Sequence, residues 1–137
     1  MEILFFSSEN LKLHLDYKKN VKRFEKIAFF EGAHIDCINF IFVNDRSIFL
    51  MNEKFLHHSY PTDIITFDYS LNKIVSGDIY ISVETVLYNS KKYSVSFGNE
   101  LNRVMIHGLL HLLGYKDKNI SEKKKMRSKE NFYLKLF

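Results

Sequence analysis

The hydrophobic positions of the chain fall into short apolar runs, which predict strands, and into repeats at helical spacing, which predict helices. The run that ends at Val43 is apolar enough for a strand in the middle of a sheet. The predicted strands are Glu2–Phe6, Ile35–Val43, Ile64–Tyr69 and Ile79–Ser82, and a hairpin turn at Asn72 is expected to join the last two.

Five segments carry apolar residues at the spacing of a helix that buries one face. In the first, Tyr17, Val21, Phe24 and Ala28 recur among lysines and glutamates, and Gly32 ends the pattern. The other predicted helices run from about Ser47 to Leu56, from Val83 to an end near Tyr93–Ser96, from Asn99 to Gly114 and from about Ser121 to Leu136. Their expected caps are Asn44 or Asp45 for the first of these, Asn99 for the third and Ser121 for the last.

This order of elements predicts an α+β fold, a mixed sheet of about four strands with helices packed on it. The helix that contains His107 is apolar on most sides, since His107 and His111 are its only strongly polar residues between Val104 and Leu113. We therefore expect it to be a buried central helix that crosses one sheet face. The whole chain, with 137 residues, suits a single domain that spans residues 1–137.

The composition is that of a globular protein, with 46% hydrophobic and 26% charged residues. No apolar stretch approaches the length of a membrane span, and no signal peptide is recognisable at the start. The single cysteine, Cys37, cannot form an internal disulfide and lies in an apolar run, where a packing role is expected. These features predict a soluble, cytoplasmic protein without a membrane partner.

Positive charge is concentrated near the C-terminus. The net charge of +4 at pH 7 is mild evidence for a polyanionic partner. Two interpretations of the basic cluster stay open, an RNA-binding surface and a solvated helix face. The candidate RNA-binding residues are Lys116, Lys118, Lys123, Lys124, Lys125 and Arg127.

A candidate metal site lies at the end of the His107 helix. His107 and His111 are four residues apart, so both imidazoles lie on one helix face. Gly114 offers a helix stop that would turn the chain back and bring Asp117 towards the rings. Two imidazoles and a carboxylate form a catalytic type of site with one position open, and one Zn²⁺ is the first expectation. The alternative is that the histidines are core residues bonded to carbonyl groups.

The segment from His107 to Asp117 resembles the signature of the YbeY family, bacterial metal-dependent endoribonucleases associated with 16S ribosomal RNA maturation. That signature has the form His-Gly-x-Leu-His-Leu-x-Gly-Tyr-Asp-His, and its three histidines are the zinc ligands. Further landmarks similar to those of the family are Asn52, Pro61-Thr62-Asp63, Phe67 and Gly77-Asp78-Ile79. The resemblance therefore extends from about Leu50 to Asp117.

The chain departs from the family pattern at two places that matter for chemistry. Asp117 stands at the position of the third histidine, and its harder oxygen donor could broaden the choice to another divalent metal. Leu56 stands where the family usually has an arginine expected to handle RNA phosphate. His57 or His58 could partly replace that arginine, or both could be loop residues without a role.

The resemblance implies a metal-dependent, single-strand-specific endoribonuclease that acts in ribosomal RNA processing and ribosome quality control, with ribosomal RNA or the small ribosomal subunit as partner. Hydrolysis would use the metal to polarise a phosphoryl oxygen or to generate a hydroxide nucleophile. The alternative is a non-catalytic RNA-binding or ribosome-binding module with a structural metal. A third hypothesis, a non-haem iron oxygenase, rests only on the two-histidine, one-carboxylate ligand set.

No general base is evident from the sequence. Gly108 occupies the position of the catalytic glutamate of His-Glu-x-x-His metalloproteases, which argues against peptide hydrolysis. Asp63 could orient a metal-bound water, or it could brace its loop. Tyr115 could stack on a base, or it could pack the turn after the helix. Both pairs of alternatives stay open at this point.

Overall fold

The strands form one mixed sheet in the computed structural model, which describes residues 1–8, 13–56 and 62–136. Their order across the sheet is β1-β2-β4-β3. The β1–β2 and β2–β4 pairs are parallel, whereas β3 and β4 form an antiparallel hairpin. The four strands are β1 (Glu2–Ser7), β2 (His34–Val43), β3 (Ile64–Asp68) and β4 (Ile74–Ser82). The predicted α+β fold with a mixed sheet is confirmed.

The second strand of the hairpin is longer than the sequence pattern predicts. It begins at Ile74 instead of Ile79, directly after a turn in which Asn72 adopts a left-handed φ of 56°. Ser76 and Asp78 concealed this start, because their side chains lie on the more open face of the sheet and interrupt the apolar run. Alternating burial along β4 shows that only one of its faces is fully covered at this end.

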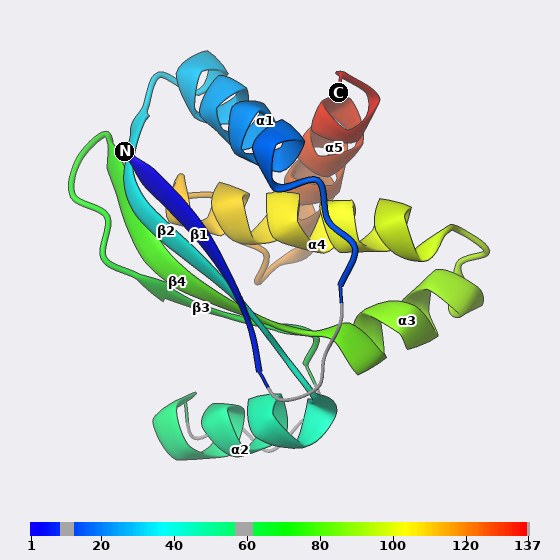
Figure 1. Cartoon of the computed structure of the whole chain (residues 1–137). Coiled ribbons are helices and arrows are strands. Elements are labelled where there is room, and N and C mark those ends of the chain that lie inside the picture. Colours follow the sequence, from blue (N-terminus) through cyan, green and yellow to red (C-terminus); the bar gives the residue numbers. More distant parts are fainter. Residues whose placement is uncertain (9–12, 57–61, 137) are drawn as a thin grey trace.

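The helices lie on both faces of the sheet (Figure 1). Helices α1 and α4 cover one face, α5 packs on the outer side of α4, and α2 lies against the opposite face. Their bounds are α1 (Tyr17–Phe30), α2 (Asp45–Leu56), α3 (Val83–Lys92), α4 (Phe97–Leu112) and α5 (Ile120–Leu136). Because α4 lies between the sheet and α5, it is buried on most sides, as predicted.

Two of the predicted helix caps are wrong. Helix α4 is capped by Ser96, whose side chain accepts a hydrogen bond from the Asn99 amide at 3.0 Å, so Asn99 lies inside the first turn. Helix α5 begins at Ile120, where the Asn119 side chain accepts from the Glu122 amide at 2.8 Å. Glu122 accepts in return from the Asn119 amide, which completes a capping box and places the predicted cap Ser121 inside the helix.

Helix α4 approaches the sheet very closely because Gly108 faces it. A Cβ at Gly108 would lie 2.9 Å from Ile79 Cγ2 and 3.0 Å from Ile64 Cδ1, closer than packed atoms tolerate. Gly108 therefore has a packing role, and the small residue lets α4 lie directly on β3 and β4. The adjacent His107 is thereby held close to the β3 end of the sheet.

Two further sequence expectations concern packing and membranes. Cys37 is half-buried beside an irregularity in the β2–β4 register, so its packing role is only partial. Among residues 1–8, 13–56 and 62–136, no helix combines the length and apolar character needed to cross a membrane.

Candidate metal centre

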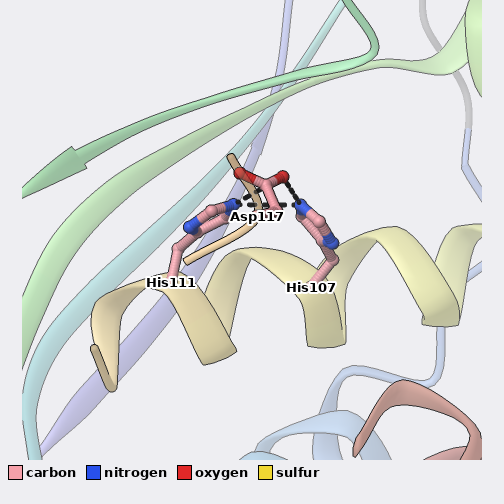
Figure 2. A group of neighbouring side chains, drawn as sticks. All are labelled: His107, His111 and Asp117. Atoms are coloured by element: carbon pink, nitrogen blue, oxygen red, sulfur yellow. Dashed lines mark hydrogen bonds and ion pairs between the residues drawn. The ribbon is translucent and has the colours of Figure 1, made fainter. Parts of the chain in front are cut away.

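The end of α4 has the geometry that brings Asp117 back over the helix. Gly114 adopts a φ of 102°, its amide donates to the His111 carbonyl at 3.0 Å, and the Tyr115 amide donates to the Leu110 carbonyl at 3.0 Å. This pair of bonds is a Schellman motif, which satisfies the last carbonyls of the helix and reverses the chain. The helix stop predicted at Gly114 is confirmed, and Asp117 lies above the histidine face of α4 (Figure 2).

The side chains of His107, His111 and Asp117 converge, and the structure identifies them as a group that could hold a metal ion. The two Nε2 atoms lie 3.0 Å apart, and Asp117 Oδ2 lies 3.3 Å from each of them (Figure 2). Tetrahedral Zn²⁺ with ligands at 2.0–2.1 Å requires ligand atoms about 3.3–3.4 Å apart. The spacing of the three donors therefore fits a zinc-sized cation.

Glu130 on α5 supports His107 from behind and was missed by the sequence analysis. Its carboxylate is buried, with Oε2 at 2.6 Å from His107 Nδ1. A carboxylate at Nδ1 holds the proton there and leaves the Nε2 lone pair directed at the metal position, a common arrangement behind histidine ligands. One signal for it was available in the sequence, because Met126, Glu130 and Tyr133 share one face of α5 that would otherwise be an apolar stripe.

The electrostatics of the two imidazoles differ. Burial lowers the pKa of His107, but the hydrogen bond and charge of Glu130, with Asp117 and Asp63 nearby, outweigh burial and raise it overall. Burial and the neighbouring His107 lower the pKa of His111, which favours its neutral form. Glu130, Asp117 and Asp63 thus surround the rings with negative charge, a suitable environment for a divalent cation.

Two cavities meet at the candidate ligands His107 and Asp117. One, of about 290 Å³, lies between α4 and α5. The other, of about 360 Å³, lies beside β3 and the end of α2. His107, Asp117 and Asp63 line both cavities, so among the described residues the candidate metal position is bordered by a cavity on two sides.

Asp63 lies at the junction of these cavities. Its backbone carbonyl accepts a hydrogen bond from the Ser82 amide at 2.9 Å, which anchors the start of β3 to the end of β4. Burial raises the pKa of its carboxyl group, an effect that His107 partly offsets. Both the bracing role and a role towards water or substrate are compatible with this position, and the second stays a prediction.

The structure separates the predicted basic cluster into distinct groups. Lys123 and Arg127 line the 290 Å³ cavity, together with Arg103 of α4, which the sequence analysis did not select. Lys125 instead lies over the Tyr115 ring, 5.6 Å from its centroid. The lining of the two cavities at the metal centre does not include Lys116, Lys118, Lys124 or Lys125.

Tyr115 packs the turn after α4, one of its two predicted roles. Its hydroxyl donates to Glu31 Oε1 at 2.5 Å, and the carboxylate of Glu31 also accepts from Lys129 and Tyr133. This cluster ties the turn that carries Asp117 to α1 and α5. The other role, stacking of its ring on a base, stays a prediction.

Leu56 makes one side of the candidate site apolar at the position where the family resemblance leads us to expect an arginine. Leu56 ends α2 and lines the 360 Å³ cavity, so this side of the metal position offers a leucine in place of a cation. His57 and His58, the suggested replacements, and Pro61 of the predicted loop lie outside the described residues.

Known proteins resemble this chain over most of its length. A family model described as Endoribonuclease YbeY matches residues 6–137. The chain is 51% identical over 100 residues to the Endoribonuclease YbeY of Flavobacterium psychrophilum, which covers 73% of this chain and 71% of the relative. It is 41% identical over 138 residues to that of Christiangramia forsetii, which covers 99% and 94%.

A solved structure gives the same result at the level of the fold. The solution structure of a Thermotoga maritima protein superposes with a TM-score of 0.66 at 29% identity and covers 97% of this chain and 87% of that one. The expected resemblance is confirmed by the family match and by both relatives. The chain therefore belongs to the YbeY family of endoribonucleases.

Proposed function

We propose that this protein is a metal-dependent endoribonuclease that hydrolyses phosphodiester bonds of single-stranded RNA at the His107, His111 and Asp117 centre. The observation that carries the proposal is the convergence of three donors, with 3.0–3.3 Å between them, at the junction of two cavities. Family membership supplies the reaction class, because the relatives are named endoribonucleases.

We propose Zn²⁺ as the ion, on the basis of the donor set and spacing. When bound, the ion supplies a Lewis acid next to the scissile phosphodiester. Asp117 and the two histidines hold it, and Glu130 keeps the His107 proton on Nδ1. Asp63, which lines both cavities and has its pKa raised by burial, would orient water or hold a proton at its carboxylate beside the substrate.

The open character of the site favours catalysis over a purely structural metal. Within the part of the chain that the structure describes, the candidate group comprises three side chains, not the four of closed structural sites. The cavities beside the ligands would leave room for water or substrate next to a bound ion.

Cleavage of a labelled single-stranded RNA by zinc-loaded protein tests the activity, with a duplex of the same sequence as the comparison. We expect His111→Ala to reduce cleavage by at least 100-fold, because the metal loses one of its three protein ligands. His34→Ala is the matched control, since its exposed ring lies on β2 outside both cavities. Unchanged metal-dependent cleavage by His111→Ala would falsify the proposal.

The cellular substrate follows from the family resemblance, and we propose ribosomal RNA precursors for it. The chain would then act in ribosomal RNA maturation and in ribosome quality control. Sequencing of ribosomal RNA ends in cells that express either wild-type or His111→Ala protein tests this assignment. Precursor ends that accumulate only with the variant are expected, and identical ends in both strains would contradict it.

A further inference from the structure

We propose that Arg103 and Arg127 form a phosphate-binding clamp in the cavity between α4 and α5 and receive the RNA backbone beside the metal centre. This inference rests on the proposed function and adds to it the side from which the substrate is held. It also supplies lysine and arginine side chains, which the described lining of the opposite cavity does not include; there Leu56 occupies the position at which the family is expected to carry an arginine.

Both guanidinium groups are held at the same buried carboxylate. Arg103 Nη1 lies 3.1 Å and Arg127 Nη1 3.6 Å from Glu130 Oε1, while the other oxygen of Glu130 bonds His107. The two arginines therefore come from different helices but are placed side by side, next to a candidate metal ligand. Arginine suits this role because its planar fork can bind two phosphate oxygens at once.

The two arginines are accessible to a ligand to different degrees. The Arg127 side chain is 58% exposed, whereas that of Arg103 is 20% exposed and forms the inner wall of the cavity. Lys123 lies one helical turn before Arg127 on the same side of α5 and lines the cavity as well. A backbone phosphate entering this cavity would meet Arg127 and Lys123 first and Arg103 at the inner end.

Carboxylates of the cavity contact both arginines but leave part of each guanidinium group for a ligand. Glu130 is occupied by His107 and the arginines, and Asp117 faces the metal position. Arg103 also directs Nε towards Glu100 Oε1, at 4.0 Å, while its Nη1 contacts Glu130. A guanidinium group carries five N–H donors, so these contacts engage only part of each arginine. The remaining N–H donors of Arg103 and Arg127, with the Lys123 ammonium group, are therefore the groups that would bind a phosphate in this cavity.

Binding of a fluorescent single-stranded RNA, measured by anisotropy at several salt concentrations, tests the clamp. Arg127→Gln is the main variant, because its exposed side chain can be replaced without disturbing the core. Lys135→Gln is the matched control, since it removes the same charge from an exposed site two turns further along α5. Zinc affinity is measured for both variants, to separate a lost RNA contact from a damaged metal centre.

We expect Arg127→Gln to weaken RNA binding about 10-fold and to reduce the salt slope by about one, as for one lost phosphate contact. Arg127→Lys should lose less RNA affinity than Arg127→Gln, and Lys135→Gln should change RNA affinity by less than about 2-fold. Zinc affinity should stay unchanged in all three variants. Arg103→Gln should weaken RNA binding to a similar degree. If that variant fails to fold, the comparison of Arg127→Gln with Lys135→Gln decides the test.

Equal binding by Arg127→Gln and Lys135→Gln would overturn the clamp, and so would a loss of zinc that accounts for the weaker binding. Failure of the proposed function has a different signature, because wild-type protein would then not cleave the RNA. The binding comparison between the variants does not require cleavage, so the two outcomes are distinguishable.

Discussion

At the residue scale, the site depends on Glu130, which contributes a hydrogen bond and no metal donor atom. Asp117 was predictable because it lies close to the histidines in sequence and follows a glycine helix stop. Glu130 lies 23 residues after His107 on a helix dominated by lysines, so only the packing of α5 on α4 shows that it meets the ring. Local spacing therefore predicted the donors, and tertiary contact determined their support.

Replacement of Glu130 by glutamine should weaken zinc binding about 10-fold, the lower end of the range for groups that orient a ligand. The amide is neutral and fixes the His107 proton less firmly than the buried carboxylate does. Competition with a chromogenic chelator measures the affinity. Nitrogen-15 spectra of the imidazole report the tautomer and should show a larger share of the Nε2–H form.

Tyr133→Phe is the control for that variant. It removes a hydrogen bond from the same buried face of α5, the bond to Glu31, without touching the His107 ring. Its zinc affinity should stay within about 2-fold of wild type, although the free energy of unfolding falls by about 1 kcal/mol. Equal losses of zinc affinity in both variants would show that Glu130 acts only through the stability of α5.

At the element scale, the fold could be predicted where periodicity is strong and not where polar residues interrupt it. Asn44 caps α2 as expected, with its side chain 2.8 Å from the Ser47 amide. The start of α4 was misplaced, since Gly98 in its first turn resembled a break between elements. Glycine is tolerated there because its neighbours in the first turn are held by the Ser96 cap.

Acid should destabilise the junction of α1, α5 and the turn after α4, because Glu31 lies there. Burial alone would raise the pKa of this carboxyl group, but hydrogen bonds from Tyr115, Tyr133 and Lys129 lower it below its ordinary value of 4.5. A depressed pKa in the folded state means that the group stabilises the fold above the unfolded-state pKa. That contribution is lost as the pH falls below about 4.5 and through the folded-state value.

Urea unfolding of wild type and Glu31→Gln at several pH values checks this expectation. Near pH 7 the variant should be less stable by about 1–2 kcal/mol, the cost of weakening hydrogen bonds to a charged group. The difference should shrink as the pH falls below about 4.5. Glu25→Gln, at an exposed site of α1, serves as the control and should show no such convergence. A pH-independent difference for Glu31→Gln would contradict the assignment.

At the scale of the whole molecule, the metal centre joins parts of the chain that the sequence keeps apart. Helix α4 carries two donors, the turn after it carries the third, α5 supplies Glu130, and the start of β3 supplies Asp63. The order β1-β2-β4-β3, which decides that β3 lies beside α4, could not be read from one sequence because it depends on long-range pairing. A bound cation should therefore stabilise the entire fold.

Zinc should raise the melting temperature of the protein in proportion to the logarithm of its free concentration. An ion that binds only the folded state contributes about 2.7 kcal/mol at a concentration 100 times its Kd. Asp117→Ala should lose most of this gain, because the centre keeps only two protein ligands.

Asp117→His restores the donor type of the family signature. Its melting temperature should still rise with Zn²⁺ but rise less with Mn²⁺ than that of wild type, since imidazole is the softer ligand. Melting curves of metal-depleted protein with added Zn²⁺ or Mn²⁺ measure both effects. If Asp117→Ala gained as much stability from zinc as wild type does, the carboxylate would not be a ligand.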